Sequence, residues 1–169
     1  MVDSCRRAVR AYEVDATLAG QASANMAHVE RASVVHASGA QPSLPEADVI
    51  YVNAGVTAPL PAWLDALRIG GRLVLPLTAA NWYGWVLLVT RTTGDAYAAR
   101  PVCRVGIIPC TDARDEAASP RLVAAFETNT VRNVRALYRN DAPDESCWYS
   151  GNGWWLSTRE PTQGQGRLS

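Results

Sequence analysis

An acidic residue at the end of an apolar strand is the first feature of this sequence with a possible chemical role. The segment 9–15 is predicted to contain a strand that ends at Glu13. In open α/β sheets, an acid just past a strand tip can accept hydrogen bonds from a ribose, and it normally follows a glycine-rich turn by about 20 residues. Only twelve residues precede Glu13, and none is glycine. The pattern is that of a nucleotide-type cofactor fold that begins one strand late. A solvated strand-end acid is the alternative interpretation of Glu13.

Alternating helix and strand patterns would position this acid. Asp15 can cap a helix, because its carboxylate can accept a hydrogen bond from the first helical turn. The apolar face of this helix is predicted from Ala16, Leu18, Ala19, Ala22, Met26 and Ala27. Residues 32–36 are a short β-branched strand, and the run 48–53 is apolar and bounded by turn residues. Such a run is typical of a strand that is buried on both faces of a parallel sheet.

The next segments complete a strand, helix and strand unit. Pro59 and Pro61 introduce a short helix over residues 62–67, and Gly70 and Gly71 are expected to stop it before a second buried strand at 72–77. Crossovers of this kind place their two strands parallel.

The second half of the chain is predicted to be richer in antiparallel strands. Residues 85–89 and 102–109 are expected to pair around a turn near residues 94–95. A helix is predicted at 120–126, and strands at 131–138 and 154–157. The stretch 148–155 indicates a tight turn between two aromatic-rich strands.

Composition limits the classes of function. The chain has 169 residues, which fits one domain, and its sixteen basic and sixteen acidic side chains cancel. Because these charges cancel, the chain has no excess of positive charge that would attract nucleic acid or an anionic membrane surface, and neither is an expected partner. No apolar run approaches the roughly 18 residues of a spanning helix, so a cytoplasmic location is predicted. The four cysteines form no C-x-x-C pair and neither histidine stands at ligand spacing from them, so no metal site is expected.

An ordered set of motifs resembles one enzyme family. The set comprises the acid-ended strand, the run from Val34 to Gly39, the strand and turn from Asp48 to Gly55, the Leu60-Pro61 helix and the Gly70-Gly71-Arg72-Leu73 strand that ends at Leu77. Over about residues 9–110, this order is similar to the second half of protein-L-isoaspartate O-methyltransferases, which are class I methyltransferases. The block from Asp48 to Leu77 is its most specific portion.

The resemblance implies that S-adenosyl-L-methionine is the cofactor. Glu13 would accept hydrogen bonds from the ribose hydroxyls, and Val14 would lie against the adenine face. Ser38, followed by Gly39, stands where the family usually has an acid that binds the adenine amino group; a serine there can hydrogen-bond but brings no charge. Asn53, Ala54 and Gly55 match the turn beside the reactive end of the cofactor, where small residues let a backbone and an acceptor approach closely.

The expected fold is α/β, a partial Rossmann-like methyltransferase sheet that is mostly parallel with antiparallel C-terminal strands. The first strand and glycine-rich loop of the family are missing from the pattern, so the strands that end at Glu13 and Asn53 would either pair directly or leave an incomplete fold. We expect a partial methyltransferase domain at residues 1–110 and an extension of unassigned role at 111–169.

The implied reaction is methylation of a carboxylate on a protein or peptide. A carboxylate has a pKa near ~4 and is already ionised at pH 7, so no general base, and therefore no catalytic side chain, is predicted. A non-catalytic remnant that retains only the sheet is the alternative. Several tryptophans could line an acceptor pocket, although packing is their commoner role. They are Trp82, Trp85, Trp148, Trp154 and Trp155.

Overall fold

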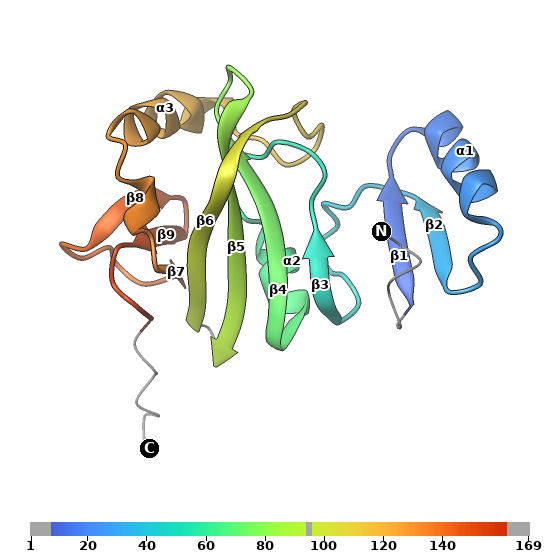
Figure 1. The fold of residues 1–169 in the computed structure, drawn as a ribbon, viewed down its shortest axis with the longest axis horizontal. Coiled ribbons are helices and arrows are strands. Elements are labelled where there is room, and N and C mark those ends of the chain that lie inside the picture. Colours follow the sequence, from blue (N-terminus) through green and yellow to red (C-terminus); the bar gives the residue numbers. More distant parts are fainter. Residues whose placement is uncertain (1–7, 94–95, 162–169) are drawn as a thin grey trace. The chain divides into compact units, whose positions relative to one another are not determined.

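The computed structural model describes residues 8–93 and 96–161. The chain divides into two compact units, with the boundary in the sequence between residues 41 and 42. The first unit contains strand β1 (Val9–Glu13), helix α1 (Ala16–Met26) and strand β2 (Ala32–His36), and β1 pairs with β2 in parallel (Figure 1). These three elements confirm the predicted order. Asp15 caps α1, because its Oδ1 accepts a hydrogen bond from the Leu18 amide at 2.9 Å.

The predicted apolar face of α1 is only partly correct. Ala19 is buried and Ala22 and Met26 are half-buried, but Leu18 is 52% exposed. Ala16 and Ala27 are exposed as well. A two-stranded sheet is narrow, so within this unit it covers only one strip of the helix surface. Apart from Ala19, Val29 is the one buried apolar side chain among the described residues of the unit.

The second unit is built on a seven-stranded sheet in the order β3-β4-β5-β6-β7-β9-β8 (Figure 1). Its strands are β3 (Ala47–Tyr51), β4 (Leu67–Thr78), β5 (Tyr83–Thr93), β6 (Ala96–Gly106), β7 (Ala136–Arg139), β8 (Cys147–Gly151) and β9 (Trp154–Ser157). The predicted parallel pair is confirmed as β3–β4, and the predicted antiparallel pair as β5–β6; the turn between these last two lies outside the described residues. The structure is α/β as predicted, with a mixed sheet in which fewer strands are parallel than expected.

The prediction that β3 is buried on both faces is wrong. β3 stands at the end of the strand order, and Val49 and Tyr51 are 52% and 53% exposed. β3 is therefore an edge strand in spite of its apolar composition. β1, which ends at Glu13, and β3, which precedes Asn53, belong to separate sheets, one in each unit.

The two glycines after helix α2 (Pro61–Ala66) have a different role from the predicted helix stop. The helix ends at Ala66, and β4 begins at once with Leu67. Gly70 has a φ of 78°, and a Cβ on Gly71 would lie 2.7 Å from the Arg68 carbonyl oxygen. The chain therefore bends within β4, where the pairing with β3 shifts register, and only glycine fits that backbone approach.

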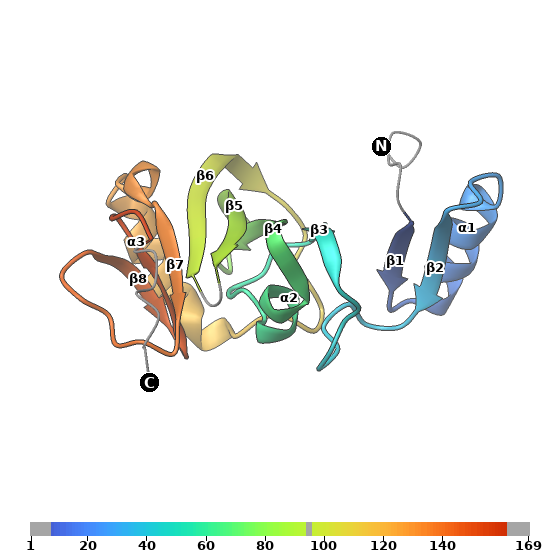
Figure 2. The same cartoon turned by 90° about the horizontal axis from the view of Figure 1, so that it is seen from below.

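The core of the second unit lies on one face of β4 and β5, where α2 lies close to β4 (Figure 2). Alternate residues of the strands point into it, as the period of two requires. The buried side chains include Trp63 and Leu64 of α2, Leu73, Leu75 and Leu77 of β4, and Trp85, Leu87 and Val89 of β5.

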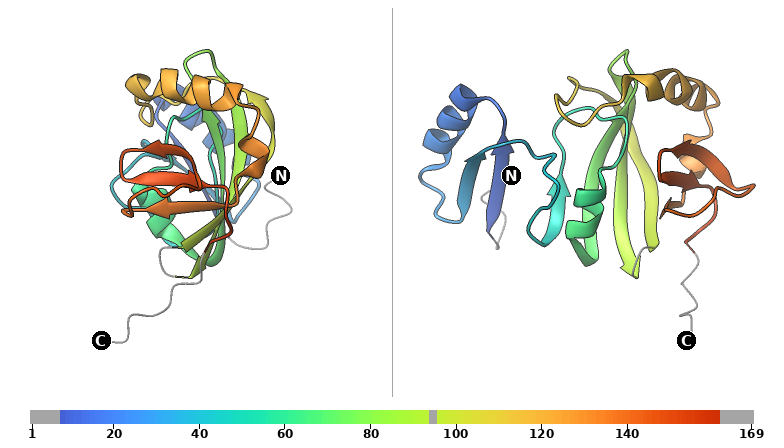
Figure 3. Two further views of the ribbon diagram at one scale, coloured as in Figure 1. Left: turned by 90° about the vertical axis from the view of Figure 1, so that its left-hand side faces the viewer. Right: turned by 180° about the vertical axis from the view of Figure 1, so that it is seen from behind.

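The C-terminal segments continue the same sheet. β6 pairs with β7, so the sheet crosses the expected domain boundary at residue 110. The predicted aromatic hairpin is confirmed as β8–β9, with Gly153 at a φ of 74°. The predicted strand at 131–138 is a 3-10 helix (Val131–Asn133) followed by β7. Helix α3 (Ser119–Glu127), preceded by a 3-10 turn (Glu116–Ala118), lies beside β8 (Figure 3). No helix of the described segments is long and apolar enough to cross a membrane.

Candidate functional site

Four of the predicted site residues gather at the carboxyl edge of the β1–β2 pair. Glu13 is the register partner of His36, so Val14 and Ser38 leave the two strands at the same edge. The Glu13 carboxylate accepts a hydrogen bond at Oε1 from the Asp15 amide, at 2.9 Å. Of its two oxygens, only Oε1 has a hydrogen-bond partner among the described residues. The carboxylate is therefore oriented by the chain and retains acceptor capacity.

The residues around Glu13 are held by short local contacts. Ser38 Oγ accepts a hydrogen bond from the Ala40 amide at 3.0 Å, which leaves its hydroxyl hydrogen available. His36 Nε2 lies 3.2 Å from the Val14 carbonyl oxygen. Val14 itself is 48% exposed. A Cβ on Gly39 would lie 3.6 Å from the Tyr12 Cβ, which is an ordinary contact, so sterics do not require glycine there.

The other three predicted site residues form the turn after β3 in the second unit. The Gly55 amide donates to the Ile108 carbonyl oxygen at 2.8 Å, and the Gly55 carbonyl accepts from the Cys110 amide at 2.8 Å. Asn53 is exposed, and its Oδ1 accepts a hydrogen bond from the Tyr51 hydroxyl at 3.4 Å. Ala54 is half-buried. The turn therefore exposes Asn53 and is held in place by the backbone hydrogen bonds of Gly55.

Gly55 has a structural role that the sequence did not reveal. It is buried, and a Cβ at this position would lie 2.4 Å from Thr78 Oγ1 and 3.3 Å from the Ile107 side chain. A contact of 2.4 Å essentially never occurs, so any larger residue would displace the turn or its neighbour Thr78. The expected reason for a small residue was approach of a ligand, whereas the observed contact is with β4 and the segment after β6.

Arg114 connects the turn to its surroundings. Its Nη1 donates to the Gly55 carbonyl oxygen at 3.1 Å and to Thr78 Oγ1 at 3.0 Å, while its Nε donates to Glu116 Oε1 at 2.8 Å. The Arg114 side chain is only 6% exposed. Its Nη2 is also buried and finds no partner among the described residues. The hydrogen bond from Arg114 holds the pKa of the Glu116 carboxyl below its ordinary value of 4.5.

Sequence reasoning missed Arg114, Thr78 and Thr57. Arg114 stands next to Asp115 and Glu116, a charge pattern typical of a solvated loop. Instead, the loop is anchored, because the Asp115 amide donates to Thr57 Oγ1 at 2.7 Å. The contact between Arg114 and Gly55 spans 59 positions, so no local pattern could indicate it.

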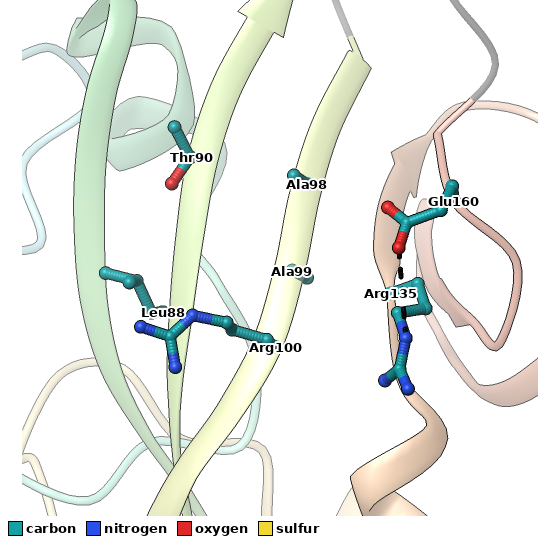
Figure 4. A pocket seen from close by; sticks show the side chains of 7 residues that line it. All are labelled: Leu88, Thr90, Ala98, Ala99, Arg100, Arg135 and Glu160. Carbon is teal, nitrogen blue, oxygen red and sulfur yellow. Dashed lines mark ion pairs between the residues drawn. The ribbon is translucent and has the colours of Figure 1, made fainter.

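Two hollows lie at opposite ends of β5 and β6. The larger, which we call the α3 groove, has a volume of about 670 Å³ and lies between α3 and the start of β5. Its principal lining residues are Asn81, Tyr83, Trp85, Arg104, Phe126 and Asn129. The smaller, the Arg100 cavity, measures about 200 Å³. In it Arg100 extends toward Leu88 while Arg135 Nε lies 3.8 Å from Glu160 Oε1 (Figure 4).

The α3 groove has the position expected of a ligand site. β3 and β4 run parallel, and residues 79–81 directly follow β4, just as Asn53 follows β3. Ligands of open α/β sheets bind outside the carboxyl ends of the strands. The Arg100 cavity lies toward the opposite ends of these strands. Thr90 in its wall pairs with Arg72, which is in the first half of β4.

Comparison with known proteins identifies a relative for about half of the chain. The chain is 32% identical over 79 aligned residues to a protein-L-isoaspartate O-methyltransferase of Methanothermobacter thermautotrophicus. The aligned region covers 46% of this chain and 36% of that protein. The chain is similar to protein-L-isoaspartate O-methyltransferases. The resemblance seen in the motifs is thereby confirmed, although no family model matches the sequence.

Solved structures agree on the fold. A protein-L-isoaspartate O-methyltransferase from Plasmodium falciparum, in complex with S-adenosyl-L-homocysteine, matches with a TM-score of 0.53 and 16% identity, over 60% of this chain and 51% of that one. A second structure named protein-L-isoaspartate O-methyltransferase matches with a TM-score of 0.54 and 20% identity, over 72% of this chain and 37% of that one. The chain thus has the methyltransferase fold, and it spans about half or less of the length of the proteins that it matches.

Proposed function

We propose that this chain carries cofactor-binding and acceptor-binding parts of an S-adenosyl-L-methionine-dependent methyltransferase of the protein-L-isoaspartate type. The observation that carries the proposal is the 32% identity over 79 residues to such an enzyme. The motif order found in the sequence and the fold shared with two solved structures support it.

The first unit has side chains that fit the nucleoside part of the cofactor. Glu13 has acceptor capacity left for the ribose hydroxyls, and the exposed side chain of Val14 offers an apolar surface for the adenine ring. Ser38, next to Gly39, can donate its hydroxyl hydrogen, but it brings no charge to the adenine amino group.

The turn 53–55 would border the reactive end of the cofactor. Its backbone is fixed by hydrogen bonds at Gly55, and Asn53 is exposed beside the small side chain of Ala54. When bound, S-adenosyl-L-methionine supplies an activated methyl group. The residues of the chain then have to bind and align a carboxylate that is already ionised, and alignment of this kind is worth about 7–11 kcal/mol in favourable cases. No general base is needed.

Calorimetric titration with S-adenosyl-L-homocysteine tests the proposal. We expect saturable binding, weakened about 10- to 100-fold by Glu13→Gln, because a charge-assisted hydrogen bond to the ribose is lost. Glu30→Gln, which changes an exposed acid of the same unit, is the matched control and should leave the affinity unchanged. Far-ultraviolet circular dichroism verifies that both variants fold.

A non-catalytic role is the second candidate, and the uncharged Ser38 is the observation that favours it. A folded chain that does not bind S-adenosyl-L-homocysteine would support this candidate and contradict the methyltransferase proposal. Restoring an acid through Ser38→Asp separates the two further. If the site is otherwise intact, the added charge should tighten binding by several fold, since charge-assisted hydrogen bonds are about twice as strong as neutral ones.

A further inference from the structure

The α3 groove has the chemistry of a site for an acidic peptide segment. Helix α3 and the adjoining ends of β5 and β6 lie at the same end of the second unit (Figure 1). This is also the edge at which the turn 53–55 leaves the sheet, since a parallel bridge joins Val56 to Leu77. A molecule in the groove would therefore lie beside the carboxyl end of β4, at the usual ligand edge of an α/β sheet.

Two arginines converge on one tryptophan in this region. The Arg104 guanidinium carbon lies 5.8 Å from the ring centre of Trp85, and that of Arg132 lies 5.3 Å from it. Trp85 is 8% exposed, whereas both arginines are exposed. Among the described residues, no carboxylate forms an ion pair with either arginine. The stacking on Trp85 fixes the two cations while leaving their hydrogen-bond donors available.

The walls of the groove suit a peptide backbone and its side chains. Tyr83 is 69% exposed and its ring packs on Gly106, where a Cβ would lie 3.1 Å from it. Phe126 provides a second aromatic surface from α3. Asn81 and Asn129 add amide groups that can bond to main-chain groups of a ligand. Glu127 is the acidic residue of the lining and Arg104 the basic one, so a ligand carboxylate would bind nearer Arg104.

We infer that the α3 groove binds the carboxylate-bearing segment of a peptide or protein, and that Arg104 pairs with the carboxylate. The inference rests on the proposed function in one respect, namely that the acceptor of a carboxyl methyltransferase is such a segment. It adds the place where the acceptor binds and the residue that selects it. Arg104 is a specificity residue in this view, and the aromatic side chains supply contact area that does not depend on charge.

Two fluorescently labelled hexapeptides of one sequence test the inference, one with an L-isoaspartyl residue and the other with asparagine at the same position. Anisotropy titrations of the full chain, with and without S-adenosyl-L-homocysteine, measure both affinities. We expect the isoaspartyl peptide to bind at least tenfold more tightly. Arg104→Gln should remove that preference, because the charge-assisted pair is lost. Tyr83→Ala should weaken both peptides equally.

Arg100→Gln is the matched control, because Arg100 lies on the same strand and lines the other hollow. It should preserve the preference. Equal loss in Arg100→Gln and Arg104→Gln, or no peptide binding by the wild type under either condition, would overturn the inference. Arg104→Lys, which retains the charge, should retain part of the preference and replaces Arg104→Gln if that variant does not fold.

The two proposals fail in different ways. Peptide discrimination without binding of S-adenosyl-L-homocysteine would uphold the groove and contradict the methyltransferase. Binding of S-adenosyl-L-homocysteine together with equal affinity for both peptides would uphold the methyltransferase proposal and contradict the inference about the groove.

Discussion

The two sets of predicted cofactor residues are held in place very differently. At the edge of β1 and β2, Glu13 and Ser38 accept hydrogen bonds from backbone amides only two positions away, and about half of the Val14 surface is exposed. In the turn after β3, Gly55 is buried and is bonded to Cys110 and Arg114, far along the chain. Substitutions at the first set should therefore change binding at little cost in stability, while those at the second should change both.

The tryptophans make this comparison measurable. All six lie beyond residue 41, so tryptophan fluorescence reports unfolding of the second unit alone. Far-ultraviolet circular dichroism includes the signal of α1 and therefore also reports on the first unit.

Gly55→Ala should have the largest effect on stability. The new Cβ would lie 2.4 Å from Thr78 Oγ1, and relief of that overlap requires the turn to move. We expect a loss of about 1–3 kcal/mol in the free energy of unfolding, measured by urea denaturation with tryptophan fluorescence. Gly39→Ala is the control in the first set, and its Cβ meets only an ordinary contact at 3.6 Å. Its unfolding is followed by circular dichroism at 222 nm, because the first unit holds no tryptophan. Equal destabilisation by both variants would contradict the comparison.

Arg114→Met should rank second. It keeps most of the buried volume but removes the hydrogen bonds to Gly55 and Thr78, which are worth about 0.5–1.5 kcal/mol each. The buried Nη2 has no partner among the described residues, so its removal offsets part of this loss. We expect a net destabilisation of about 1–2 kcal/mol by urea denaturation. Glu116→Gln leaves both bonds in place and should cost less, because Glu116 is 66% exposed.

Asp15→Ala tests the first unit. It removes the hydrogen bond to the Leu18 amide at the beginning of α1, and loss of such a cap typically costs about 1 kcal/mol. We expect earlier loss of the circular dichroism signal at 222 nm and an unchanged midpoint for tryptophan fluorescence. Asp15→Asn can still accept the hydrogen bond and should be close to the wild type. A shift of the fluorescence midpoint in Asp15→Ala would show that the cap matters beyond its own unit.

The acid dependence of stability should be the smallest effect. A hydrogen bond from Arg114 lowers the pKa of Glu116 from its ordinary value of 4.5, and one from Ser146 lowers that of Asp144 from 3.8. A carboxyl whose pKa is lower in the folded state stabilises it above its unfolded pKa, and this contribution is lost as the pH falls through the folded pKa. Fluorescence-monitored stability should therefore decline below about pH 4.5. Glu116→Gln and Arg114→Met should both make the decline less steep; an unchanged slope in both would contradict the assignment.

The order of the elements could be predicted because its signals are local. Asp15 as a helix cap, the β-branched strand at 32–36 and the parallel pair around α2 each depend on patterns within a few residues. The sequence also placed Glu13 at a strand end and Asn53 in a turn, and the structure has both there. For the same reason, the resemblance to methyltransferases could be found from short motifs in a fixed order.

Only the tertiary structure decided how these elements are used. An apolar run does not tell an edge strand from a central one, so the exposure of Val49 and Tyr51 depends on the place of β3 in the strand order. The need for glycine at position 55 comes from Thr78 and Ile107, and the groove beside Trp85 comes from α3 packing near β5. The sequence by itself determined the local elements and the acid at the tip of β1. Contacts between distant positions, such as the hydrogen bond from Arg114 to Gly55 across 59 positions, determined which residues are fixed in place and where a ligand can bind. No local pattern encodes such contacts.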